Sequence, residues 1–339
     1  MENLEVPPNV TAPTTSSATL LIVPLILELL IPFVESLLGV ILNTFIVVVN
    51  AVGWAKNFQL NSCDLIITCL GFSQVLMQML NLLPFLVFCC STCVPWFNRH
   101  INVLDVLGLA LSYITFWSIA CLHVFYCVRI TNFRQSSFQH LKARTRQWIP
   151  WLLLGCLLVS VLMAVPAPWA LYSLHPIFAY PLLFWNTTGN ATNYLHLEPV
   201  IVAYQVVHYA APLTLFLFSY VPPFLMCCGA ATLLLTSLWQ HTRRMALCNS
   251  SFRGPNQVAH FKAIKSVSIS CCIFAIYFLT TMSSRLHLLW PLCYQIRLCP
   301  IILTGFPIFQ SLILIFTNIK LRQAAFGILF YCRCKGRRA

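Results

Sequence analysis

The residues best placed for chemistry in this sequence are Ser237, His241 and Met245, which follow one another at intervals of four. At that spacing they share one face of a helix, and this face continues out of a long apolar segment into a polar stretch. Such a face, followed by a basic segment, supports hydrogen bonds and ion pairs with a partner. The nearby cations are Arg243, Arg244, Arg253, Lys262 and Lys265. An ordinary basic loop of a channel or transporter is the alternative.

Residues arranged for catalysis are not found. The sequence contains no Walker loop, no zinc-spaced set of His and Cys, no GxSxG elbow and no paired carboxylates at helical spacing near a histidine. The last apolar run, 298–317, has no lysine that could form a Schiff base with retinal. We therefore expect neither an enzyme nor a retinal pigment, and no metal or other cofactor.

The composition requires a lipid environment. The chain is 59% hydrophobic and only 8% charged, which a soluble fold of 339 residues would not need. The net charge of +13 is spread over short segments between apolar runs. That pattern is typical of membrane topology and not of nucleic-acid binding.

Seven apolar runs are long enough to cross a bilayer, because each exceeds the roughly 20 residues that a membrane helix needs. We therefore predict an all-α membrane protein with a seven-transmembrane helix bundle. The runs are 20–50, 64–90, 103–128, 148–172, 201–238, 266–289 and 298–317. A transporter would be expected to carry more buried charge or an internal repeat.

The lysines and arginines predict the orientation. With the amino terminus outside, all 20 of them except Arg99, Arg285 and Arg297 fall on the cytoplasmic side. We therefore predict an extracellular terminus at 1–19, a bundle at 20–317 and a cytoplasmic basic tail at 318–339. The first run itself is expected to act as the insertion signal. Three sequons then lie outside as predicted glycosylation sites, at Asn9, Asn186 and Asn190.

Polar residues recur along the first two runs at helical spacing. In the first run they form one stripe, which must face the bundle because a carboxylate is costly in lipid. In the second run we interpret them mainly as contacts that hold helices together, with a ligand or ion role as the alternative. The stripes are Glu28, Glu35, Gly39, Asn43 and Asn50, then Asp64, Gln74, Gln78 and Asn81.

Asp105 and Ser112 lie two turns apart on one face of the third run, about 10 Å along the helix. The carboxylate could meet a cationic ligand or sit in headgroup water.

The cysteines leave open which thiols form disulfides and which carry a lipid. Cys93, Cys293 and Cys299 could pair, while Cys332 and Cys334 suit palmitoylation as well as they suit two idle thiols.

A set of motifs in this order resembles the bitter-taste receptors, the taste receptor type 2 family of G-protein-coupled receptors. The resemblance covers residues from about 35 to 324. It rests on Gly39, Asn43, Phe45, Ile46, Asn50 and Trp54; Asp64, Leu65, Ile66 and Ser73; Trp117, Ala120, Phe125, Tyr126, Arg129, Ile130, Asn132 and Phe133; Leu141 and Lys142; Pro223 and Phe224; Ser237, Leu238, His241 and Met245; His260, Ala263 and Lys265; and Ser311 to Ile315, Asn318, Lys320 and Leu321.

The chain departs from the pattern of that family at several positions. Gln74 replaces an arginine, Gln310 a histidine and Ile319 a proline, and Arg129 keeps the charge of a lysine. Gly108 and Ser112 stand where the family often has Trp and Asn. We therefore expect preserved coupling residues and a wider, less polar outer pocket, and whether Gln74 and Gln310 raise basal activity stays open.

The resemblance implies a plasma-membrane receptor that binds small bitter compounds and activates a gustducin/Gi-type G protein. The implied ligand-binding residues are Asp105, Gly108, Ser112, Phe274 and Tyr277, with Ser112 and Tyr277 as hydrogen-bond donors and Phe274 as a packing wall. Those implied in G-protein coupling are Arg129, His241, Met245, His260, Lys262 and Lys265. The alternatives are a vomeronasal type 1-like receptor and a seven-helix channel or transporter.

Overall fold

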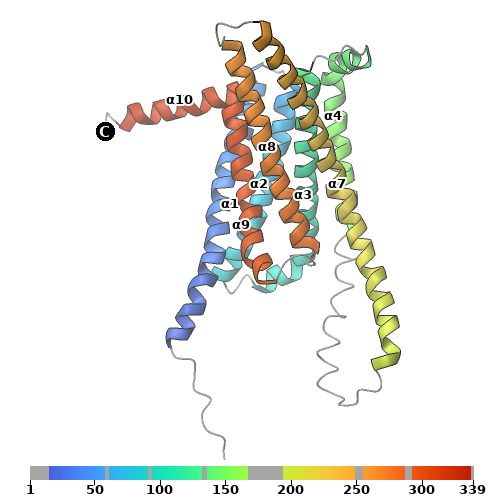
Figure 1. The fold of residues 1–339 in the computed structure, drawn as a ribbon. Helices are drawn as coiled ribbons and strands as arrows, with labels where there is room; N and C mark the ends of the chain where they lie inside the picture. Colours follow the sequence, from blue (N-terminus) through green and yellow to red (C-terminus); the bar gives the residue numbers. More distant parts are fainter. Residues whose placement is uncertain are drawn as a thin grey trace, which may run out of the picture.

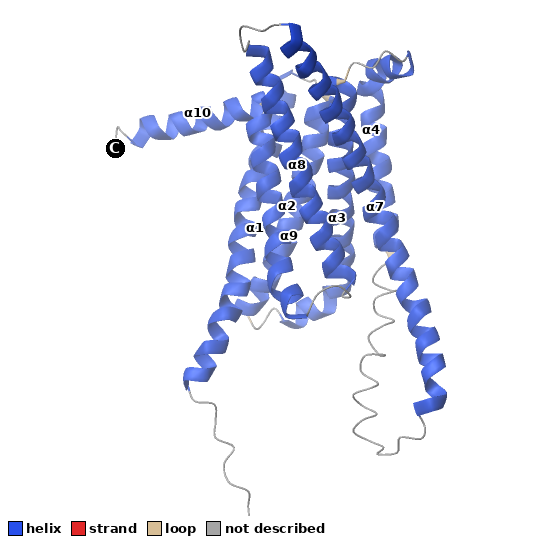
Figure 2. Ribbon diagram, in the orientation of Figure 1, coloured by secondary structure: helices blue, strands red, loops and turns tan. Residues whose placement is uncertain are grey.

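The computed structural model describes residues 15–57, 61–90, 94–131, 136–166, 194–248, 255–286 and 292–336. Within these ranges the chain is helical, and no strand occurs (Figure 2). The prediction of an all-α protein is confirmed. The helices are α1 (Thr15–Asn57), α2 (Ser62–Cys89), α3 (Val94–Ile130), α4 (Ser136–Ala164), α7 (Tyr194–Cys248), α8 (Pro255–Leu286), α9 (Leu292–Thr317) and α10 (Ile319–Gly336).

Seven of the described helices are long and apolar enough to span a membrane. The candidate spans are 29–56, 62–87, 99–130, 147–164, 214–240, 265–284 and 298–317, so each predicted run contributes one. They stand together as a bundle, whereas α10 leaves it at a steep angle (Figure 1). The seven-helix prediction is confirmed, and the outside position of the amino terminus stays a prediction.

Helix α3 lies at the centre of the packing, because it contacts α2, α4 and α7, while α1 packs on α2 and α9. Its apolar residues account for much of the core. Tyr113, Phe116 and Ile119 are fully buried, and Leu122 is nearly so. These buried side chains fill the space between α3 and the helices that contact it.

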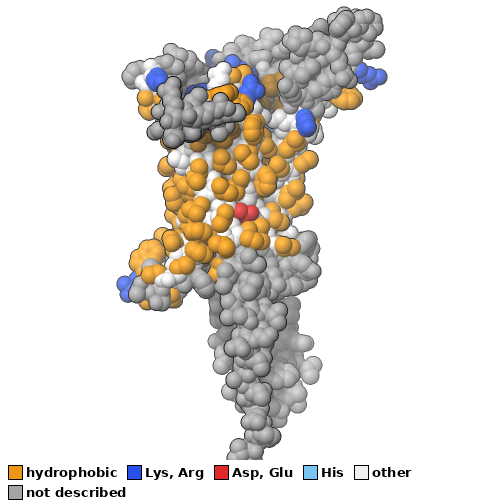
Figure 3. Space-filling view, turned by 90° about the vertical axis from the view of Figure 1, so that its left-hand side faces the viewer, with side chains coloured by type: hydrophobic (Ala, Val, Ile, Leu, Met, Phe, Trp, Pro, Cys, Tyr) orange, Lys and Arg blue, Asp and Glu red, His pale blue; other side chains and the backbone are white. Residues whose placement is uncertain are grey.

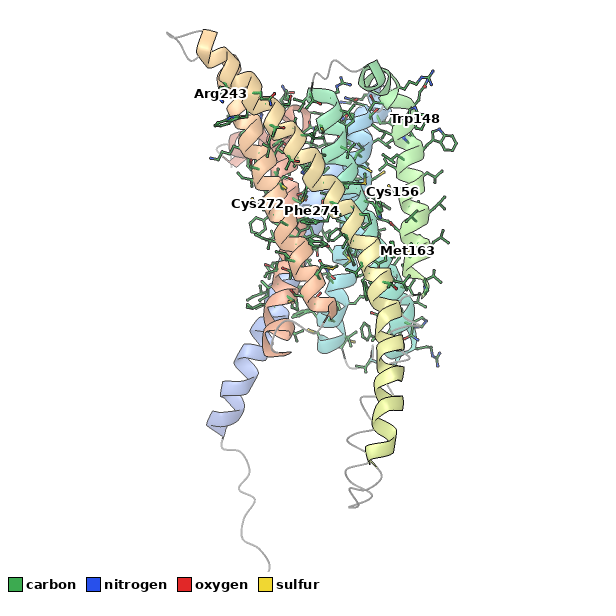
Figure 4. All side chains as sticks on the ribbon, turned by 45° about the vertical axis from the view of Figure 1, so that its right-hand side comes forward. Trp148, Cys156, Met163, Arg243, Cys272 and Phe274 are labelled. Atoms are coloured by element: carbon green, nitrogen blue, oxygen red, sulfur yellow. The ribbon has the colours of Figure 1, made fainter. Side chains whose placement is uncertain are left out.

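The outer surface of the bundle is apolar. Large hydrophobic side chains cover the face shown in Figure 3, and the lysines and arginines gather near its ends. On α4, Trp148 points away from the bundle (Figure 4) and Trp151 is 73% exposed. A surface of this extent and composition suits contact with lipid tails.

Polar side chains connect the helices inside this apolar surface. Ser311 Oγ on α9 donates to Asn43 Oδ1 on α1 at 2.9 Å, and Gln78 Nε2 on α2 donates to the carbonyl of Thr304 at 2.8 Å. Thr304 Oγ1 also lies 2.6 Å from Glu35 Oε2. These bonds favour the interpretation of the two polar stripes as helix-to-helix contacts.

The predicted stripe on the first helix is mostly buried. Gly39, Asn43 and Asn50 are buried, while Glu35 is half-buried and Glu28 has a side chain outside the described residues. The Glu35 carboxylate is bonded to the Thr304 hydroxyl on α9 and still remains partly exposed at the edge of the contact between α1 and α9. The expectation that the whole stripe faces the bundle is therefore right for the amides and incomplete for Glu35.

Several helix ends differ from the predicted runs. Helix α7 continues to Cys248, ten residues beyond the predicted run, so the backbone over Ser237, His241 and Met245 is helical as predicted. Helix α10 (Ile319–Gly336) lies within the predicted tail 318–339. Asn318 explains its start, since the Asn318 Oδ1 accepts the backbone N–H of Lys320 at 3.0 Å and caps the new helix.

Candidate functional site

The five residues predicted to line a ligand site come from two helices. Helix α3 carries Asp105, Gly108 and Ser112, and α8 carries Phe274 and Tyr277. The structure buries Ser112, Phe274 and Tyr277 and leaves Asp105 exposed. A Cβ atom added at Gly108 would meet no other group within 4 Å, so the space beside it is open.

An aromatic cluster brings the buried members of this set together around Phe116. The ring of Phe116 lies 4.9 Å from that of Tyr277, 5.1 Å from Phe274 and 4.7 Å from Tyr220 on α7, measured between centroids. Tyr277 in turn stacks on Phe306 of α9 at 3.9 Å. Helices α3, α7, α8 and α9 therefore meet in one aromatic layer, in the part of the bundle where Figure 4 places Phe274.

Ser112 has a partner inside the protein. Its hydroxyl lies 3.0 Å from the hydroxyl of Tyr220, and both side chains are buried. Either oxygen can donate, so each hydroxyl can act as a donor or as an acceptor. Together with the rings, this arrangement can bind a small, largely apolar molecule and orient it by one polar contact.

Tyr113, Phe116, Tyr220 and Phe306 complete the aromatic cluster, and none of them was predicted from the sequence. Phe116 lies one helical turn after Ser112, so helical spacing alone could have identified it. Tyr220 and Phe306 come from distant segments, and only the packing of α7 and α9 on α3 and α8 reveals them. Sequence periodicity carries no signal for such long-range contacts.

The predicted coupling residues are described only in part. Arg129 is exposed in the last turn of α3, and Lys265 is exposed on α8. The side chains of His241, Met245, His260 and Lys262 lie outside the described residues, although their backbones belong to α7 and α8. Figure 1 shows the end of α7 and the beginning of α8 together, at the end of the bundle from which α10 departs.

The same end of the bundle contains an ion pair that was not predicted. Lys320 Nζ at the beginning of α10 lies 3.1 Å from Asp64 Oδ2 at the beginning of α2. Nearby, the hydroxyl of Tyr126 on α3 lies 3.7 Å from Cys63 Sγ on α2. These contacts connect α2, α3 and α10 beside the exposed Arg129.

Several predicted modification and disulfide sites lie outside the residues that the structure describes. Asn9, Asn186 and Asn190 lie outside the described residues, as does Cys93, and so do the side chains of Cys293, Cys332 and Cys334. Cys299 is buried with a free thiol. The disulfide that the sequence left open therefore does not involve Cys299 in this structure.

This chain is similar over most of its length to proteins of one family. A family model for taste receptor proteins matches residues 20–333. Taste receptor type 2 member 40 of Gallus gallus is 30% identical over 304 residues, which cover 89% of this chain and 94% of the relative. Taste receptor type 2 member 8 of Papio hamadryas is 28% identical over 299 residues, which cover 87% of this chain and 92% of the relative. Taste receptor type 2 member 8 of Homo sapiens is 27% identical over 303 residues, which cover 88% of this chain and 93% of the relative.

Proposed function

The chain belongs to the taste receptor type 2 family, and from this premise we propose that it detects small bitter compounds and activates a heterotrimeric G protein of the gustducin/Gi type. As a family member it is a chemosensory receptor and a multi-pass membrane protein. We place it in the plasma membrane with its amino terminus outside. The distribution of basic residues supports that orientation. A mobility shift on enzymatic deglycosylation that is lost when Asn9, Asn186 and Asn190 are changed to Gln would test it.

The observation that carries the proposal is the aromatic cluster around Phe116 with the Ser112–Tyr220 hydroxyl pair. A ligand that packs against this cluster beside Gly108 would lose its contact with water. Hydrophobic burial of this kind contributes about 25 cal/mol per Å². The hydroxyl pair would supply the one polar contact that orients the ligand.

The ligand in this proposal is uncharged or weakly polar. None of the cluster side chains carries a formal charge. Asp105, about 10 Å along α3 from Ser112, is the nearest acid on that helix. A cationic ligand would need an acid outside the cluster, such as Asp105, whereas a compact apolar compound would not.

Activation would involve the contacts between α7 and α8. Both helices contribute rings to the cluster at one end and carry proposed coupling residues at the other. A ligand that packs better against one arrangement of these rings shifts the population toward it. Separation of the two helices at their far ends would then expose Lys265 and its neighbours to the G protein.

Calcium release in cells expressing the receptor with a gustducin-tailed Gα tests the proposal. Lys265→Ala should lower the response to a bitter-compound panel at equal surface expression. Lys56→Ala, which removes another exposed cation at the same end of the bundle, should not. A current or flux that persists without the Gα would favour a channel or transporter. Equal signalling by both variants would remove Lys265 from the coupling surface.

A further inference from the structure

A layer of buried polar side chains crosses the bundle away from the aromatic cluster. It draws on four helices, and each member is at most 3% exposed. Buried polar groups in a lipid-facing bundle must find hydrogen-bond partners, because lipid offers none. The members are Asn43 on α1, Gln74 on α2, Thr115 on α3 and Gln310 and Ser311 on α9.

Contacts between neighbouring helices place Gln74 and Gln310 at one level. Successive spans alternate in direction, so α2 and α9 run in opposite directions. Gln78 on α2 bonds to Thr304 on α9, so Gln74, one turn before Gln78, is level with residue 308. Gln310 is two residues further on, about 3 Å along the axis.

The other members are fixed at the same level by further contacts. A Cβ added at Gly39 on α1 would lie 2.5 Å from Gln78 Nε2, so Asn43, one turn after Gly39, is level with Gln74. Asn43 bonds to Ser311 at 2.9 Å. On α3, Thr115 Oγ1 lies 3.4 Å from the hydroxyl of Ser73, the residue before Gln74.

The two glutamines differ from the rest of this layer in their hydrogen bonding. Both Nε2 and Oε1 of Gln74, and Oε1 of Gln310, are buried without a hydrogen-bond partner among the described residues. Each is only 1% exposed. A buried amide left in this state has given up its hydrogen bonds to water without replacement, so a ligand that satisfies these atoms would be held strongly.

We propose that this layer, defined by Asn43, Gln74, Thr115, Gln310 and Ser311, binds ordered water between α1, α2, α3 and α9. Water both donates and accepts, which matches an orphaned amide that needs a donor for Oε1 and an acceptor for Nε2. Buried waters in proteins typically make about three hydrogen bonds to groups of this kind. A metal cation would satisfy the oxygens alone, and the five named side chains carry no charge that would balance it.

Radiolytic labelling can detect such water directly. Brief X-ray pulses convert bound water into hydroxyl radicals, which oxidise adjacent side chains that bulk solvent cannot reach. Ile46, Leu70 and Leu314 lie one turn or less from the layer and are at most 2% exposed. In purified receptor exchanged into H₂¹⁸O, these three should acquire ¹⁸O. Leu234 on α7, which is 1% exposed, should stay unlabelled.

Variants then connect the label to the glutamines. A Gln74→Met, Gln310→Met double variant removes the orphaned atoms with little change in side-chain length, and it should lose the label at all three probes. Gln147→Met, a change at an exposed glutamine on α4, should keep it. If the double variant does not fold, each single variant should reduce the label.

Three results would overturn the proposal. Unlabelled probes in the unmodified receptor would show a dry layer. Labelling that is unchanged in every glutamine variant would show that the water is held elsewhere. A melting temperature that rises with sodium, but not with N-methyl-D-glucamine, and only while both glutamines are present, would identify a cation as the occupant.

Discussion

Lys320 on α10 and Asp64 on α2 form an ion pair of 3.1 Å at the end of the bundle where the predicted coupling residues lie. The side chains are 37% and 17% exposed, respectively. A Cβ atom added at Gly53 on α1 would come within 2.5 Å of Lys320 Nζ. One lysine thus connects the beginning of α10 to two other helices.

We predict that Lys320→Ala destabilises the receptor modestly. A partly exposed ion pair contributes about 0.2–1 kcal/mol, so the melting temperature of purified receptor should fall slightly. Gly53→Ala should have a similar effect, because its new methyl group would displace the flexible end of Lys320. Arg322→Ala, at an exposed cation on the same helix, serves as the control and should leave the melting temperature unchanged.

A double-variant cycle separates this mechanism from general damage to the helix. If Gly53→Ala acts by breaking the ion pair, it should add little in a Lys320→Ala background. Fully additive effects would contradict the assignment.

The second prediction concerns the hydroxyl pair beside the aromatic cluster. Tyr220→Phe keeps the ring contacts with Phe116 and removes one hydroxyl, and Ser112→Ala removes the other. If the pair orients the ligand, either change should weaken the potency of hydrogen-bonding bitter compounds about two- to tenfold, the value of one hydrogen bond. The potency is measured as the half-maximal concentration for calcium release at matched surface expression.

The double variant should be no weaker than the worse single variant, because the two hydroxyls act as a unit. Thr281→Val is the control, since this buried hydroxyl donates to the backbone carbonyl of Tyr277 in its own helix. A loss in the control equal to that of Tyr220→Phe would show that the effect is structural.

Local composition was enough to predict the architecture of this receptor. A bilayer-spanning segment is long and apolar over about 20 consecutive residues, so seven runs predicted seven helices. Helix ends were less predictable, because they depend on single contacts. The start of α10 is set by the Asn318 side chain, and the length of α7 beyond residue 238 has no apolar signal.

The candidate site was predictable only where its residues share a helix. Ser112 and Tyr277 were identified, and Phe116, one turn after Ser112, could have been found from helical spacing. The hydroxyl of Tyr220 could not, because its contact with Ser112 joins segments far apart in the sequence. The ion pair of Asp64 with Lys320, separated by 256 residues, was missed for the same reason.

The third prediction contrasts two glycines. The position of Gly108 on α3 has open space, so Gly108→Trp should reach the cell surface and change which compounds in the panel are recognised. Gly39 on α1 packs against Gln78, and Gly39→Ala should cost about 1–3 kcal/mol by overpacking. Of these two variants, flow cytometry should therefore show reduced surface expression for Gly39→Ala alone. A compound profile that is unchanged in Gly108→Trp would show that position 108 is not part of the ligand site.

The last prediction tests whether α7 and α8 separate on activation. Cys227 on α7 interacts with Cys271 on α8, whereas Cys121 on α3 lies 3.8 Å from Cys156 on α4. Copper(II) phenanthroline, with two copper ions each accepting one electron, can oxidise either pair of thiols to a disulfide, and the two thiol protons pass to water. A bridge between α7 and α8 would restrain the proposed movement and should lower the maximal response to a saturating ligand. Cys271→Ala should restore the response, and Cys156→Ala should not. Rescue by Cys156→Ala instead would mean that α3 and α4 are the helices that must move.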